Sequence, residues 1–192
     1  MPKIKLGPKT LVFPMPTFLV GANIENKPNF MAVAWGGIAN GTPPMISVAI
    51  RHTRYTYQGI RENDTFSVNI PSIKMVTETD YCGIISGSKA EKVDSCKFKI
   101  FYGVVGTAPM IKQCPVNLEC TVAHTLDLGS HVLIIGKIEE TYINDNCLTD
   151  GKPDITKIKP FMYTSYEESY RQIGDVLAKA FHVGKSLKGK EA

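Results

Sequence analysis

Apolar residues recur at alternate positions in several short runs of this chain, and turn-forming residues separate the runs. Such alternation predicts β-strands. The expected strands are 17–24, 30–38, 45–50, 65–70, 116–126 and 130–143. The "DLG" stretch between the last two is a natural hairpin turn. Six or seven strands at this spacing indicate an antiparallel barrel, closed or nearly closed.

Helical spacing of apolar residues is found in fewer places. Residues 54–63 lie between two expected strands, and 72–86 starts at Ser72, a candidate N-cap. The clearest amphipathic pattern is 166–181, which carries Tyr166, Tyr170, Ile173, Leu177 and Phe181 at helical intervals. Strands and helices do not alternate regularly, so a doubly wound sheet is not expected. We expect one mainly β domain over residues 1–192, with helices inserted after the third and fourth strands and a C-terminal helix at about 166–183.

The composition is ordinary for a globular protein, with 43% hydrophobic and 21% charged residues. The net charge of +4 is spread along the chain, which argues against nucleic-acid binding. No signal-peptide pattern and no apolar run of ~20 residues is present, so we expect a soluble cytoplasmic protein without a membrane partner. The five cysteines form no CxxC pair, which favours reduced thiols and no metal site.

The stretch "AIRHTRYTYQGIREN" (49–63) is a candidate anion site. Phosphate groups bind well to helix N-termini, hydroxyl groups and guanidinium groups. Arg51 and Arg54 supply the cations, Thr53 and Thr56 the hydroxyls, and a helix is expected to begin nearby. The alternative interpretation is that Thr53 is only an N-cap and that the arginines are solvated.

Three further stretches are candidates for ligand contact. In "MAVAWGGIANGTPP", small residues around Trp35 would let a flat ligand approach the backbone, although a barrel strand with a bulge explains them equally. The Ser-Gly-Ser turn within 84–98 offers polar contacts or a plain helix C-cap. His131 opens a strand, where a surface or capping role is the alternative.

Motifs for side-chain catalysis were not found. GxSxG, HExxH and GxGxxG are all absent, so no catalytic nucleophile is expected and any nicotinamide cofactor would bind without a Rossmann turn.

The order of several segments resembles the order found in the flavin reductase-like, FMN-binding split-barrel family. Within that family, the chain looks like the flavoredoxin branch. The resemblance runs from about residue 16 to the C-terminal "YRQIGDVLAKAFHVGK". The segments that carry it are "MAVAW", "PPMISVAI", the Arg-x-Thr-Arg-Tyr-Thr junction, "FSVNIP", "SGSKAEKVDSCKF", "CPVNLEC" and "GSHVLIIGKIEE".

This resemblance implies an antiparallel, Greek-key type split β-barrel that binds FMN non-covalently at the interface of a homodimer. The junction residues would hold the phosphate, and the stretch 32–36 would line the isoalloxazine and ribityl chain. Asn69, the Ser-Gly-Ser turn and His131 would lie near the flavin, although Ser88 stands where the family often has Arg. The implied site residues are Ala32, Val33, Ala34, Trp35, Gly36, Arg51, Thr53, Arg54, Tyr55, Thr56, Asn69, Ser86, Gly87, Ser88 and His131.

Two modes of action follow from the resemblance. One is an NAD(P)H-dependent FMN reductase, with NADH and NADPH not distinguished. The other is a flavoredoxin-like electron carrier that exchanges electrons with redox protein partners, which the tail and the free thiols favour slightly. Two alternatives remain: a split-barrel protein without reductase activity, either pyridoxamine-phosphate-oxidase-like or haem-binding, and an FMN-free interaction module.

Overall fold

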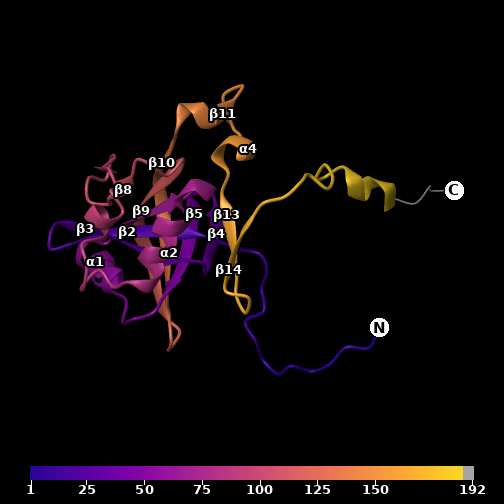
Figure 1. Cartoon of the computed structure of the whole chain (residues 1–192), viewed down its shortest axis with the longest axis horizontal. Helices are drawn as coiled ribbons and strands as arrows, with labels where there is room; N and C mark the ends of the chain where they lie inside the picture. Colours follow the sequence, from indigo (N-terminus) through magenta and orange to yellow (C-terminus); the bar gives the residue numbers. More distant parts are fainter. Residues whose placement is uncertain (188–192) are drawn as a thin grey trace.

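The computed structural model describes residues 1–187, and its centre is a seven-stranded antiparallel sheet (Figure 1). The strand order is β3-β2-β6-β9-β10-β5-β4. All expected strands are present, and the mainly β fold class is confirmed. The strands are β2 (Phe18–Ile24), β3 (Lys27–Val33), β4 (Gly36–Gly41), β5 (Pro44–Ile50), β6 (Thr65–Ile70), β9 (Val116–Asp127) and β10 (Val132–Ile143).

Helices and short strands surround this sheet. The two helices expected after the third and fourth strands are confirmed: α1 (Tyr55–Asn63), and η1 (Ile73–Met75) continuing as α2 (Val76–Ile84). The Ser72 side chain accepts a hydrogen bond from the Lys74 N–H, so Ser72 is the N-cap of η1. The remaining elements are β1 (Met15–Pro16), α3 (Lys92–Ser95), β7 (Ile100–Phe101), β8 (Met110–Ile111), η2 (Asp145–Cys147), β11 (Leu148–Thr149), β12 (Lys152–Pro153), α4 (Ile155–Ile158), β13 (Phe161–Thr164), β14 (Ser169–Gln172) and η3 (Val183–Leu187).

Strand β2 is covered on both faces, which explains why its sequence is almost continuously apolar. Successive strand residues point to opposite faces, and Leu19 and Val20 are both fully buried. Val20 packs with Val48, Phe66 and other residues in the main core. Leu19 belongs to a second cluster with Phe30, Met75 and Cys82, on the side of α2.

The expected strand 30–38 is interrupted at Ala34 and Trp35, and this break matters for the fold. The two halves, β3 and β4, are the two opposite edges of the sheet. The Trp35 carbonyl accepts a 2.8 Å hydrogen bond from the Ala49 N–H, which fixes the crossing point on β5. Because one short connection joins both edges, the sheet must curve round on itself, and Trp35 lies at the seam.

The expected C-terminal helix is wrong. Residues 169–172 form β14, which pairs with β13, and the chain beyond them has no regular structure until η3. Tyr170 takes part in this pairing, and its hydroxyl donates a 3.0 Å hydrogen bond to Asp80 Oδ1. The tail then projects from the body, as does the N-terminal arm (Figure 1). An amphipathic helix of this length needs a surface to cover its apolar face, and the side chains of Leu177 and Phe181 are almost fully exposed.

Within residues 1–187, no helix is both long enough and apolar enough to cross a membrane.

Candidate functional site

Two adjoining cavities at the start of α1 contain most of the expected site residues. The smaller, called here the α1 cavity, has a volume of about 120 Å³, and the larger, the Trp35 cavity, about 360 Å³. Both are lined by Met31 and Arg54, so they form one continuous groove. The α1 cavity gathers Thr53, Arg54, Tyr55, Thr56, Ser86 and Gly87. The Trp35 cavity gathers Ala32, Val33, Ala34, Trp35, Arg51, Arg54 and His131.

The strand-to-helix junction places two cations beside open helix N–H groups. Strand β5 ends at Ile50, a turn closes with a 3.0 Å hydrogen bond from the Arg54 N–H to the Arg51 carbonyl, and α1 begins at Tyr55. Arg54, not Thr53, is the N-cap residue, and no side chain caps the helix. The alternative role of Thr53 as N-cap is therefore wrong. Both arginines are exposed, and neither forms an ion pair within the described chain.

Thr56 is buried at the inner end of the α1 cavity. Its Oγ1 accepts a 2.7 Å hydrogen bond from Asn29 Nδ2 on β3. Because the amide occupies an acceptor site, the hydroxyl proton of Thr56 remains available to a ligand. Gly87 lies against the same amide, since a Cβ at position 87 would overlap Asn29 Oδ1. The loop after α2 can approach β3 this closely only with glycine.

Lys92 supplies a buried positive charge to the α1 cavity. Its exposed fraction is 4%, and its Nζ donates hydrogen bonds of 2.8 Å to the Phe30 carbonyl and 2.9 Å to the Cys82 carbonyl. Burial lowers the pKa of this ammonium group. An ammonium group has three donors, so one remains after these two bonds. No carboxylate within residues 1–187 pairs with it, and a buried charge of this kind is stabilised by an anion.

The Trp35 cavity has an aromatic wall. The Trp35 and His131 rings stack with centroids 4.6 Å apart at an interplanar angle of 25°. His131 Nδ1 shares a 2.9 Å hydrogen bond with the Ser130 hydroxyl. Partial burial, and then the charges of Arg51 and Arg54, lower the pKa of His131, which favours the neutral ring. Tyr163 of β13 also lines this cavity.

Three expected site residues lie outside the groove. Asn69 is fully buried, and all its hydrogen bonds are internal: Nδ2 donates to the Leu19 carbonyl and to Ser67 Oγ, and Oδ1 accepts from the Ile111 N–H and from Asn117 Nδ2. The expected flavin contact of Asn69 is therefore wrong, because no donor or acceptor is left. Ser88 is exposed, and its hydroxyl bonds to Ser86 Oγ rather than lining either cavity.

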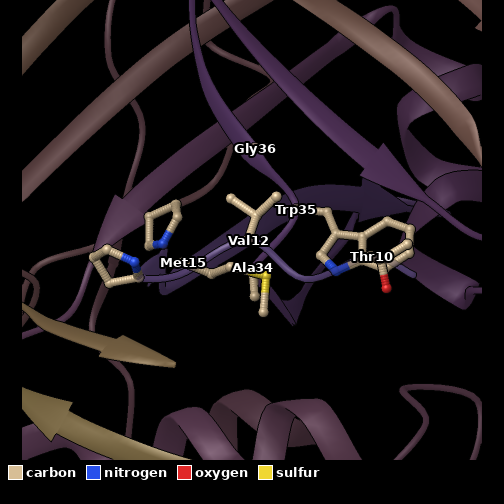
Figure 2. A pocket seen from close by; sticks show the side chains of 8 residues that line it. Thr10, Val12, Met15, Ala34, Trp35 and Gly36 are labelled. Carbon is tan, nitrogen blue, oxygen red and sulfur yellow. The ribbon is translucent and has the colours of Figure 1, made fainter. Parts of the chain in front are cut away.

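Gly36 lies next to the groove but not in it. A Cβ at this position would stand 2.6 Å from the Ser47 carbonyl oxygen, so glycine is needed for the pairing of β4 with β5. Gly36 instead lines a separate apolar cavity of about 390 Å³ (Figure 2). We call it the N-arm cavity, because Thr10, Val12 and Pro14 form one wall and Ala34 and Trp35 the other.

The sequence analysis did not identify Lys92 and Tyr163, which line the groove, or Asn29, which bonds to the groove residue Thr56. Lys92 lies within the quoted 84–98 segment, but a lysine gives no local sign that it will be buried. Asn29 lies on β3 and Tyr163 on β13, and both strands are distant in sequence from α1. Of these three residues, only Asn29 could have been found from the sequence, because the Asn before "MAVAW" is part of the family resemblance.

The five cysteines are free thiols. Cys82 lines the α1 cavity, and burial raises its pKa to about 12. In the described part of the chain, no three His, Cys, Asp or Glu side chains gather in a way that could hold a metal ion.

Comparison with known proteins identifies the family. Residues 10–174 match the model of the flavin reductase like domain. A protein of Archaeoglobus fulgidus is 33% identical over 159 residues, which cover 83% of this chain and 88% of that protein. The chain belongs to the flavin reductase-like family.

Two solved structures are similar over nearly the whole chain. The crystal structure of flavoredoxin from Methanosarcina acetivorans has 44% identity and a TM-score of 0.93, and covers 97% of this chain and 100% of its own. Flavoredoxin of Desulfovibrio vulgaris (Miyazaki F) has 38% identity and a TM-score of 0.89, and covers 95% of this chain and 99% of its own. The first superposition includes most of both terminal arms. The expected resemblance to the flavoredoxin branch is confirmed.

Proposed function

We propose that this protein binds FMN non-covalently in the groove and transfers electrons through it. The observation that carries the proposal is Lys92, a buried cation without an acidic partner, in a cavity that also contains Arg54 and the Thr56 hydroxyl. Such a cavity is suited to a phosphate group. The adjoining Trp35 cavity is three times larger and bounded by small residues and a flat aromatic pair, which suits a ring system.

The chain's residues fit this cofactor in charge, size and hydrogen bonding. The guanidinium groups of Arg51 and Arg54, the Thr53 and Thr56 hydroxyls and the first N–H groups of α1 would hold the phosphate. The stretch from Ala32 to Trp35 would bring its backbone and small side chains against the ring. FMN, when bound, supplies the hydride and single-electron chemistry.

The protein's own part is binding, orientation and electrostatics. Lys92 and the two arginines place positive charge along the groove, which favours negative charge on a bound cofactor. The neutral His131 fixes the Trp35 ring by stacking and adds no further charge. Trp35 is 42% exposed, so the groove stays open to a donor or acceptor that approaches from solvent.

An electron-transfer role of the flavoredoxin type is our first choice, with redox proteins as partners. The two flavoredoxins at 44% and 38% identity support it. An NAD(P)H-dependent reductase is the second candidate, and the open groove beside Trp35 favours it, since a nicotinamide needs access to the ring. We further propose that residues 1–192 act as one domain and assemble as a homodimer.

The decisive experiment is a visible spectrum of the purified protein, followed by anaerobic addition of NADH and, separately, NADPH. A yellow protein that is bleached by dithionite but by neither nicotinamide supports the electron carrier. Rapid bleaching by a nicotinamide supports the reductase. A colourless protein that takes up no added FMN contradicts the proposal, and a Soret band would instead indicate haem.

A further inference from the structure

The C-terminal tail, residues 173–187, exposes large apolar side chains along its length. Val176 is 89% exposed, Leu177 98% and Phe181 100%. It leaves β14 at Gln172 and runs outward from the body (Figure 1). Exposed apolar side chains that follow one another in this way are typical of a surface that is covered in the working protein.

The sequence of the tail is patterned for packing. Ile173, Leu177 and Phe181 recur every four residues, so they would share one face of a helix. Polar residues such as Asp175 and Ser186 would lie on the opposite face. A segment of this length is not a stable helix in water without a surface to cover its apolar face. The missing helix and the exposed side chains are both consistent with a tail that is not docked on any surface.

A matching apolar surface lies on both sides of strand β1. On one side is the N-arm cavity, lined by Val12, Met15 and Trp35 (Figure 2). On the other is a cavity of about 420 Å³, the β13 cavity, lined by apolar residues that include Phe18, Ile70 and Phe161. Because both cavities share Pro14, Met15 and Pro16, they form one apolar surface, which we call the β1 surface.

The tail starts at this surface but does not cover it. Ile173, its first residue, lines the β13 cavity, and the chain after it runs away from the body (Figure 1). Its reach of roughly 50 Å when extended is long enough to cross onto a neighbouring molecule. The match to the Methanosarcina flavoredoxin crystal structure covers 97% of this chain, so most of both arms has a counterpart in that relative.

A second copy of this chain fits these facts. Each copy has one outward tail and one uncovered β1 surface, and a two-fold axis brings each tail to the other copy's surface in two equal contacts. We propose that the tail of one copy docks on the β1 surface of a second copy and becomes helical there. Trp35 and Ala34 line both the N-arm cavity and the groove, so the partner's tail would also close the groove's open side.

The closure of the groove rests on the proposed FMN site, whereas the docking of the tail does not.

The test is hydrogen exchange of the full chain at 100 µM and 0.1 µM, with sedimentation at the same concentrations. We expect the amides of 174–183 to be protected in a dimer at the high concentration, and to lose protection as the dimer dissociates. Protection that is the same in a monomer would show docking on the chain's own body and would overturn the proposal. Unprotected tails at both concentrations would overturn it as well.

Variants locate the contact. Leu177→Asp with Phe181→Asp should weaken dimerisation at least tenfold and speed FMN release. Both side chains are almost fully exposed in a single copy, so the two changes should not disturb the fold of that copy. His182→Asp with Ser186→Asp adds the same charge on the opposite helical face and should leave both properties near wild type. Equal effects of the two pairs would contradict the proposal. A protein that is colourless but shows concentration-dependent tail protection would overturn the FMN site and leave the docking intact.

Discussion

Asn29 Nδ2 donates a 2.7 Å hydrogen bond to Thr56 Oγ1, and this bond ties the first turn of α1 to strand β3. It joins the helix start, where we propose that the phosphate binds, to the strand that leads to Trp35. The pair therefore sets the distance between the two ends of the groove. Both side chains are buried, so the bond also contributes to stability.

Replacing Thr56 with Val keeps the shape of the side chain and removes its hydroxyl. The Asn29 amide would lose its acceptor, so we expect a loss of roughly 1–3 kcal/mol in the free energy of unfolding. FMN affinity should fall by about tenfold, the effect of one lost hydrogen bond. Urea unfolding and fluorescence titration measure the two effects. Thr53→Val, at an exposed position of the same junction, is the control for stability and should change the unfolding free energy little.

Replacing Lys92 with Met removes the buried charge and keeps most of the apolar stem. If Lys92 faces the phosphate, FMN affinity should fall by at least tenfold, since charged hydrogen bonds contribute about 1.5–3 kcal/mol. Riboflavin, which lacks the phosphate, should bind wild type and variant almost equally. An equal loss for both ligands would show that Lys92 faces the ring instead.

Asn69 should matter for folding and not for the ligand. Asn69→Ala leaves the Ile111 N–H and the Asn117 amide without their common acceptor inside the core. We expect a loss of about 2–4 kcal/mol in the free energy of unfolding. FMN affinity, measured on the folded fraction, should stay within about threefold of wild type. A large loss of affinity with unchanged stability would return Asn69 to the flavin site.

The five thiols should react at very different rates. Burial raises the pKa of Cys82 to about 12, and it raises those of Cys114 and Cys120 as well. Cys96 is the cysteine with a partly exposed side chain. Burial raises the pKa of Cys96 as well, so in native protein at pH 8 it should react more slowly than a free cysteine but before the other thiols, and Cys96→Ser should abolish this first phase. Labelling of any remaining thiol in the variant at the rate of Cys96 would contradict the burial of the other four cysteines.

Asp154 should titrate well below an ordinary aspartate. Hydrogen bonds from the Thr149 hydroxyl, the Thr156 hydroxyl and the Thr156 N–H lower its pKa to about 2. The folded value lies below the unfolded value near 4, so the stabilising effect is present above pH 4 and is lost as the pH falls toward 2. A carboxyl NMR titration should give a midpoint near 2. Asp154→Asn should lower stability at pH 6 and have a much smaller effect at pH 2, where about half of the native carboxyl group is protonated.

Local sequence determined the parts of this protein that depend on neighbouring residues. Alternating apolar positions set the strands, and the β5–α1 junction could be recognised because its turn, cations and hydroxyls lie within six residues, 51–56. Their arrangement depends little on the rest of the chain. Order along the chain was also enough to indicate the family.

Tertiary structure decided everything that depends on distant partners. Asn69 looked like a ligand contact, but the packing of Leu19, Ile111 and Asn117 around it consumed all its hydrogen bonds. Nothing in the local sequence marks Lys92 as buried, but α3 lies against β3, and the Lys92 ammonium group is buried there. The tail carries a helical pattern, yet a short helix is stable only where packing covers its apolar face, and the apolar side chains of the tail are exposed.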